Sequence, residues 1–335
     1  MSNILCIGEI MQRLSVSFGK TITESGEYKV DYGGCEANIA IQLSNLNNQV
    51  YFYTVLPQND LSIAVKKSLL KYKVNTSKIN YSNGRLGIYY LENGQGLKAP
   101  KVIYDRSYSA FSLINESVYN IDEILNGVDY IVMSGIDFGI SGNTKRFGFE
   151  ILKYAKKKGI KIFFDFNYRS KLWSIKDASE TIKEVIKYVD YISCGILDAE
   201  NILGIKCNNS ELDFEGKLNY FYEKIKEIYP NIRTIFSTNR NVINSSYHTI
   251  VGYYYDNQLY KSKKYDIENI VDRVGSGDYF MSGVIDGIVK NKDSQSIIDY
   301  ATPLCALKHY ILGDNGYISD EMILNVINDS QIIRR

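Results

Sequence analysis

Histidine and cysteine are scarce in this sequence of 335 residues, and their scarcity argues against several kinds of site. The only two histidines, His248 and His309, are too few for a His-rich zinc site and leave little choice for a Ser-His-Asp triad. The five cysteines are scattered, odd in number and without a Cys-x-x-Cys pair, which is not typical of a disulfide framework. We therefore expect a protein of a reducing compartment.

Net charge and long apolar runs are missing as well. Lys and Arg number 39 and Asp and Glu 38, so the formal net charge is +1 and no global field favours nucleic acid or an acidic membrane. The opening residues MSNILCIGEI contain neither a basic segment nor a long apolar segment, and no run approaches the length of a membrane span. We predict a cytoplasmic location, with no signal peptide, membrane contact or nucleic-acid partner.

The residues that are present favour a folded α/β domain. Hydrophobic residues make up 45% of the chain, enough for a sizeable core, and no repeat or low-complexity linker divides it, so we predict a single domain over 1–335. Alternating β-rich and amphipathic runs predict a mostly parallel sheet with helices on both faces. The expected strands are 3–8, 49–55, 130–133, 161–164, 191–194 and 234–236. The expected helices are 36–43, 61–72, 144–157, 178–187, 211–228, 277–290, 294–310 and 320–328.

Turn signals also predict two hairpins. The β-rich runs 86–91 and 101–104 flank a Gly-containing turn, and the runs 250–255 and 259–264 flank Asp256-Asn257.

The segment Gly275-Ser276-Gly277, followed at once by Asp278 and a helical run, carries the sharpest chemical signal. Glycines let backbone N–H groups approach a ligand, and a helix N-terminus adds free donors and a positive dipole end. Together they predict an anion hole, with Asp278 at its lip as a base for phosphoryl transfer. A short glycine pattern alone is more often a turn and a helix cap, so the longer context decides.

That context resembles the ribokinase-like carbohydrate kinases, the PfkB family. Residues 271–280, VDRVGSGDYF, resemble the family's C-terminal signature D-T-x-G-A-G-D-x-F, and Gly33-Gly34-Cys-Glu-Ala-Asn38-Ile-Ala resembles its N-terminal signature G-G-x-x-x-N-x-A. The two motifs stand in the expected order, so the resemblance covers nearly all of the chain. It implies a three-layer sandwich with a small β lid, here from about 15–32 and 86–106, and it implies ATP and Mg²⁺. A monovalent cation stays open.

Within the family, the sequence is most similar to 2-keto-3-deoxygluconate kinase. Arg273 stands where the wider family has Thr, as in that branch. Residues 86–90 and 102–106 resemble its sugar-binding strands, 165–173 its sugar and phosphate contact loop, and 306–314 its last long helix and turn. The resemblance therefore implies an ATP-dependent kinase that forms the 6-phosphate of this sugar acid.

The resemblance also implies roles for particular residues. Asp278 is the expected base, with the backbone of Gly275, Ser276 and Gly277 on the phosphate. The expected substrate-binding residues are Gly33, Gly34, Asn38, Tyr89, Tyr104, Arg106, Arg169, Asp272 and Asp314. The expected nucleotide-binding residues are Asn167, Ser237, Thr238, Arg240, Gly275, Gly277 and Lys308.

Two of these residues have a chemical reason for their role. The guanidinium groups of Arg106 and Arg169 suit a carboxylate, which a neutral sugar lacks. Ordinary explanations are a surface position for Arg106 and strand packing for Tyr89 and Tyr104.

The match weakens after the central strand. Gly195 stands where the family has the Asn of N-x-x-E, so only Asp198 or Glu200 is left to organise magnesium indirectly. Tyr279 replaces a small residue beside the base, and we expect it to crowd the site or to stack on a ligand.

Alternative functions stay open. One is a fructokinase or another PfkB sugar kinase, and another is a catalytically weak protein that binds a sugar or a nucleotide. A dinucleotide-binding oxidoreductase is remote, because no G-x-G-x-x-G follows the first strand. Since lid strands have edges that pair readily with a second copy, we also expect a homo-oligomer formed through the lid.

Overall fold

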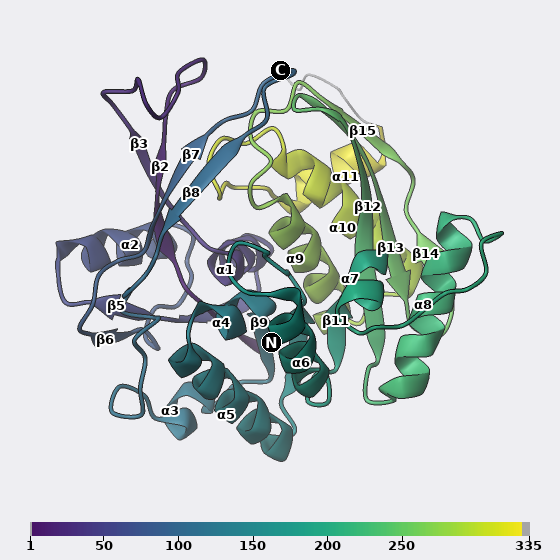
Figure 1. The fold of residues 1–335 in the computed structure, drawn as a ribbon, viewed down its shortest axis with the longest axis horizontal. Coiled ribbons are helices and arrows are strands. Elements are labelled where there is room, and N and C mark those ends of the chain that lie inside the picture. The colour runs from purple at the N-terminus through teal and green to yellow at the C-terminus, as the bar shows by residue number, and fades with distance from the viewer. Residues whose placement is uncertain (1, 330–335) are drawn as a thin grey trace.

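The structure is a computed structural model that describes residues 2–329, and a large central sheet organises it (Figure 1). The strands of this sheet are β1 (Asn3–Ile7), β4 (Gln49–Tyr53), β9 (Tyr130–Ser134), β10 (Lys161–Asp165), β11 (Tyr191–Ser193), β12 (Thr234–Asn244), β13 (Tyr247–Tyr255), β14 (Leu259–Lys261) and β15 (Tyr265–Glu268). Their order is β14-β13-β12-β11-β10-β9-β1-β4, with β15 beside β13. From β12 to β4 the neighbouring strands are parallel, which confirms the predicted sheet type.

Helices cover both faces of this sheet. One hydrophobic cluster joins it to α3 (Ile121–Leu125), α4 (Gly135–Ile140), α5 (Gly142–Lys158), α6 (Ile175–Val185), α7 (Ile196–Asn201) and α8 (Phe214–Ile228). A second cluster joins the other face to α1 (Cys35–Asn45), α2 (Asp60–Leu70), α9 (Ser276–Val289) and α10 (Ser294–Lys308). Successive β1 residues alternate between the clusters, with Leu5 and Ile7 in the first and Ile4 and Cys6 in the second. The last helix is α11 (Asp320–Ile327).

A separate four-stranded sheet stands beside the central one. It consists of β2 (Met11–Ser15), β3 (Lys29–Gly33), β7 (Ile88–Glu92) and β8 (Lys101–Asp105), in the order β3-β2-β7-β8. Of the segments that we expected as a lid, 86–106 contains β7 and β8, whereas 15–32 contributes most of β3 and the loop that joins it to β2. A short pair, β5 (Val55–Pro57) and β6 (Asn80–Ser82), forms a third sheet.

In the second predicted hairpin, the strand β13 pairs mainly with β12 and only in part with β14. The run 250–255 pairs with β14 over only three residues, whereas β13 pairs with β12 over most of its length. We expected this strand to stop at residue 236, whereas β12 continues to Asn244. Its outer half is instead held by backbone pairing to β13, which does not depend on apolar side chains.

The tip of the second sheet touches this β12–β13 hairpin, and the contact is visible at the top of Figure 1. The Gly96 N–H donates to Ser246 Oγ at 2.8 Å, and the Ser245 N–H donates to the Gly96 carbonyl at 2.9 Å. Segments about 150 residues apart therefore meet there.

No helix among residues 2–329 is long and apolar enough to cross a bilayer. All five cysteines are free thiols.

Candidate active site

A cavity of about 1550 Å³ lies between the second sheet and the ends of the central strands. Its walls include Asp165 at the end of β10 and Gly195 after β11, at the carboxyl ends of strands where α/β proteins bind ligands, and Ser237, which follows the part of β12 that pairs with β11. Of the expected residues, it is lined by Gly34, Asn38, Tyr89, Tyr104, Arg106, Asn167, Arg169, Asp198, Ser237, Thr238, Arg240, Gly275, Ser276, Gly277, Asp278 and Asp314.

The glycine loop has the geometry of an open helix N-terminus. Gly275 caps α9 with a left-handed backbone, φ 84°, and no side chain caps the first turn. A Cβ at Gly275 would lie 2.6 Å from the Asp314 carbonyl oxygen, so only glycine fits there. The Ser276 N–H already donates to the Arg273 carbonyl at 3.3 Å. The donors left for an anion are therefore those of Gly277 and of the residues around it.

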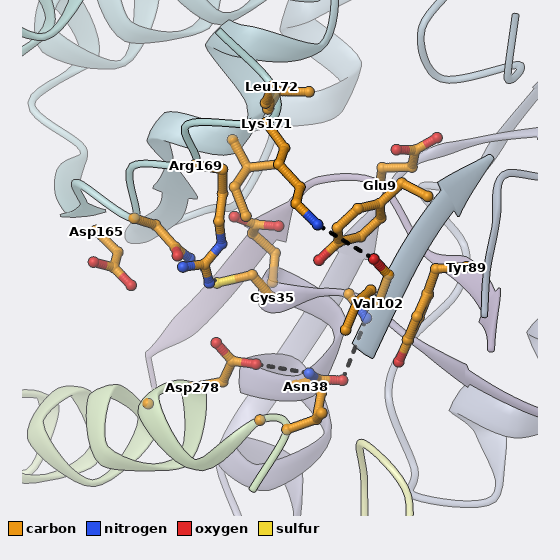
Figure 2. A pocket seen from close by; sticks show the side chains of 18 of the residues that line it. Glu9, Cys35, Asn38, Tyr89, Val102, Asp165, Arg169, Lys171, Leu172 and Asp278 are labelled. Atoms are coloured by element: carbon orange, nitrogen blue, oxygen red, sulfur yellow. Dashed lines mark hydrogen bonds between the residues drawn. The ribbon is translucent and has the colours of Figure 1, made fainter. Parts of the chain in front are cut away.

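Asp278 stands in the first turn of α9, and Asn38 Nδ2 donates to its Oδ2 at 2.6 Å (Figure 2). Burial raises the pKa of this carboxyl above its ordinary value, although the bond from Asn38 and the charge of Arg169 oppose the shift. A carboxylate with a raised pKa is a stronger base near neutral pH than an exposed aspartate.

Other buried carboxyl groups surround Asp278. Burial, together with the charges of Asp278 and Asp198, raises the pKa of Asp165 to about 7. Burial likewise raises the pKa of Glu36, on α1, to about 7, and the Oε1 atom of Glu36 has no hydrogen-bond partner. Asp137 on α4 is also buried, and the charge of Glu36 adds to its raised pKa. Carboxyl groups held this close repel one another when ionised, so part of the cluster keeps its protons at neutral pH.

Glu36→Gln should therefore change how stability depends on pH. The folded-state pKa of about 7 exceeds the ordinary value of 4.5, so the stabilisation present below pH 4.5 is lost as the pH rises through 7. Gln cannot ionise, so Glu36→Gln removes this loss. Between pH 5 and pH 8 the free energy of unfolding of the variant, relative to that of the parent, should rise by on the order of 3 kcal/mol. Urea unfolding at both pH values measures this change.

The matched control is Glu180→Gln, at an exposed glutamate on α6. It should leave the pH dependence as in the parent. A Glu36→Gln difference that stays constant with pH would show that Glu36 is ionised in the folded protein.

The two arginines of the acceptor half differ in their partners. Arg106 donates from Nε and from a terminal nitrogen to the same oxygen, Oε2 of Glu9, a side chain that is itself buried. Arg169 forms no ion pair with any residue in the described range 2–329, and Figure 2 shows its guanidinium in the middle of the pocket. Tyr89 donates its hydroxyl to Asp314, whereas the Tyr104 ring, 6.0 Å away, is 46% exposed. Of the two expected arginines, Arg169 is therefore the one without an ion-pair partner in the described chain, although its charge acts on Asp165, Asp198 and Asp278.

The remaining expected residues do not line the cavity. Gly33 packs so closely on Asp314 that a Cβ would overlap the Asp314 carboxylate. Asp272 and Lys308 are buried behind the glycine loop, and Lys308 Nζ donates to the Ile311 carbonyl at 3.2 Å. Glu200 is exposed on α7. Direct contact with a ligand in the cavity is thus left to the other residues.

The two histidines lie outside the cavity as well. His248 and His309 are buried with their rings 5.8 Å apart, and burial lowers the pKa of each to about 4. Both are therefore neutral at pH 7.

A family model described as pfkB family carbohydrate kinase matches residues 1–308. The chain belongs to this family. It is therefore a carbohydrate kinase, as the two glycine motifs predicted, and the resemblance stated from the sequence is confirmed.

Named relatives agree with the family assignment. A 2-dehydro-3-deoxygalactonokinase of Haloferax volcanii is 24% identical over 97% of this chain and 96% of its own length. A 2-dehydro-3-deoxygluconokinase of Haemophilus influenzae is 24% identical over 97% of this chain and 98% of its own. The crystal structure of the Thermotoga maritima 2-dehydro-3-deoxygluconokinase superposes with a TM-score of 0.93 and 33% identity, over 98% of this chain and 100% of the other. The ribokinase-like fold predicted from the sequence is confirmed.

The donor set of this PfkB kinase fits a magnesium ion held mostly by water and phosphate. No group of three or more His, Cys, Asp or Glu side chains in residues 2–329 could hold a metal ion alone. Asp165 and Asp198 nevertheless line the cavity close enough for their charges to interact. Asp198 also accepts the Gly195 N–H at 2.9 Å, and Gly195 leaves the cavity open where the family has a side chain. Oxygen ligands of this kind suit Mg²⁺.

Tyr279 does not crowd the site, contrary to our expectation. It is fully buried among Leu46, Tyr300 and Ile318, and its hydroxyl donates to the Gly316 carbonyl at 2.8 Å. The helix points this side chain away from the cavity, because neighbouring residues of a helix face different directions. The departure from the family pattern at 279 thus concerns packing.

Sequence reasoning missed several polar residues of this kinase. Glu9, Cys35, Glu36 and Asp165 all line the cavity, and Asn167 Nδ2 donates to Cys35 Sγ at 3.1 Å. Asp165 and Glu36 lie inside motifs that we had recognised, so their position in the sequence could have assigned them to the site. Glu9 follows the first strand without any motif, and only its contact with Arg106 reveals it.

Proposed function

We propose that this kinase transfers the γ-phosphoryl group of ATP to a terminal hydroxyl of a sugar acid, with 2-keto-3-deoxygluconate as the acceptor and its 6-phosphate as the product. The observation that carries the proposal is that Arg169, without an ion-pair partner in the described chain, shares one cavity with Asp278 and the glycine loop. A guanidinium that lines the cavity without an ion-pair partner among residues 2–329 is matched by a carboxylate on the acceptor. The names of the relatives support the same acceptor class.

The residues of the chain would act as follows. Asp278 would take the hydroxyl proton as the acceptor oxygen bonds to the γ-phosphorus and the bond to ADP breaks. The N–H groups around Gly277 would hold the negative charge of the transferring group. Asp165 and Asp198 would hold Mg²⁺, which when bound neutralises the phosphate oxygens. The second sheet would exclude water, which otherwise competes as the acceptor.

The second sheet has direct contacts with two segments outside it. Lys171 Nζ, from the loop after β10, reaches the Val102 carbonyl on β8 at 3.5 Å, as Figure 2 shows. The contact of Gly96 with Ser245 and Ser246 lies at the tip. These two contacts support a lid role for the sheet.

A neutral ketose such as fructose is the second candidate acceptor. The Glu9 carboxylate already compensates Arg106, so only one of the two expected arginines carries free charge into the cavity. A hydroxyl could accept the remaining N–H donors of Arg106 as well as a carboxylate could.

ADP release with Mg-ATP and a panel of 2-keto-3-deoxygluconate, fructose, ribose and gluconate tests the proposal. We expect turnover on the keto-deoxy acid, and Arg169→Met should raise its KM by about 30-fold or more, since a charge-assisted bidentate bond contributes roughly 2–3 kcal/mol. The control Arg146→Met, at an exposed arginine of α5, should leave KM unchanged.

Two other outcomes have definite meanings. Turnover on fructose alone, unaffected by Arg169→Met, would select the second candidate. Binding of the sugar or nucleotide without ADP release from any acceptor would contradict the kinase proposal for these substrates and favour a binding protein. The homo-oligomer that we expected through the second sheet stays a prediction.

A further inference from the structure

The most deeply buried ion pairs in the described chain join the second sheet to the glycine loop through one arginine. Arg13, on β2, has no exposed surface, and its Nε donates to Ser15 Oγ at 2.6 Å. One terminal nitrogen donates to Asp314 Oδ1 at 2.7 Å, and the other donates to Asp272 Oδ2. Residues about 300 and 260 positions apart in the sequence are therefore bridged by a single guanidinium.

Both carboxylates in turn shape the glycine loop. Asp272 accepts the Val274 N–H at 3.0 Å through Oδ1 and the Gly313 N–H at 3.1 Å through Oδ2. The Asp314 carbonyl lies against Gly275, where it leaves no space for a Cβ. The glycine loop thus packs against Asp272 and Asp314, and the side chains of both residues bond Arg13.

Arg13 itself does not line the main cavity, so it has no contact with a ligand there. Asp272 and Asp314 are only 4% and 3% exposed, and the charge of Arg13 is the one that both bond directly. Without it, two desolvated carboxylates would repel each other beside the loop, and breaking a buried pair in this way is strongly unfavourable.

We propose that Arg13 is a positioning residue: it fixes the second sheet to Asp272 and Asp314 and so holds the glycine loop in its phosphate-binding shape. This inference rests on the proposed use of the loop for the nucleotide's phosphate. It also explains why the carboxylates of Asp272 and Asp314, which we expected at the substrate, bond Arg13.

Arg13→Ala should weaken binding of a non-hydrolysable ATP analogue by about 10-fold and lower kcat by about 100-fold, because a shift of about 1 Å in a positioned group has that effect. Calorimetry measures the first and ADP release the second. Guanidinium chloride at millimolar concentration should restore both in part. A second pocket of about 220 Å³, lined by Arg13 and Asp31 on the second sheet, gives the ion a route to the vacated site.

Arg85→Ala is the matched control. Arg85 pairs with Asp105 of β8 at 2.8 Å in an exposed ion pair, so its loss should change neither quantity, and guanidinium should have no effect. Arg13→Lys tests geometry, since one ammonium cannot reproduce three directed bonds, and it should recover only part of the activity. Thermal melting of each variant shows whether it is folded.

The outcomes separate the possibilities. A folded Arg13→Ala with unchanged analogue affinity would overturn the inference. So would a loss that guanidinium does not restore while the melting temperature falls, because Arg13 would then serve stability alone. A wrong choice of acceptor would give a different result. The parent would bind the analogue normally but release no ADP with the acceptor panel. Guanidinium would still restore analogue binding in Arg13→Ala.

Discussion

Asp278→Asn should lower kcat by about 1,000-fold or more while the fold and the affinity for ATP stay near those of the parent. The amide keeps the shape of the carboxyl and can still bond Asn38, which contacts Asp278 Oδ2 at 2.6 Å, but it cannot accept a proton from an acceptor hydroxyl. ADP release under saturating substrates measures kcat. The raised pKa of Asp278 should also appear as an acidic limb in the pH profile, above the range of an ordinary aspartate, and this limb should vanish in the variant.

A remote substitution of the same kind serves as the control. Asp60 is exposed in the first turn of α2, far from the cavity lining, so Asp60→Asn should keep the activity of the parent. Substantial turnover by Asp278→Asn, with an unchanged pH profile, would exclude Asp278 as the base and direct attention to Asp165, another cavity carboxyl with a raised pKa.

Gly275→Ala is the second large effect that we expect. Gly275 has φ 84°, which costs an L-residue roughly 1–2 kcal/mol, and its new Cβ would meet the Asp314 carbonyl oxygen at 2.6 Å. The loop must move to relieve this contact, so both the anion hole and its support are disturbed. We expect a stability loss of about 2 kcal/mol or more by urea unfolding, and a fall in kcat of about 100-fold.

Gly277→Ala, two residues along the same loop, is the matched stability control. No atom lies within 4 Å of a Cβ at Gly277, and its φ is not in the left-handed region. Since alanine also favours the first turn of α9, the free energy of unfolding should stay equal or rise. Equal stability losses at 275 and 277 would contradict the assigned backbone conformation.

Local sequence patterns predicted most of the helices and strands. The helix that begins at Ser276, the long helix α5 with its left-handed cap at Gly159, and the parallel core strands all lie near their predicted positions. These elements depend on apolar periodicity and on glycine at specific positions, both of which are written into neighbouring residues. The polar outer half of β12 was missed because its neighbour β13, not its own pattern, makes it a strand.

Residue types could be predicted for the candidate site, but their partners could not. Arg106 was a reasonable carboxylate ligand until the structure placed the buried Glu9 against it. Tyr279 was expected beside a ligand, and the turn of α9 places it in a separate hydrophobic cluster. In both cases the sequence gives the chemical type of the side chain but does not show which residues surround it.

The sequence by itself determined that this chain is an α/β carbohydrate kinase of the PfkB family with a glycine loop and an adjacent aspartate, because those features reside in short contiguous motifs. Only the tertiary structure decided that Asp272 and Asp314 bond Arg13, that Lys308 lies behind the loop and that Arg169 has no ion-pair partner among residues 2–329. The physical reason is that charge compensation and burial are set by residues up to about 300 positions apart, which meet only when the second sheet packs beside the central one.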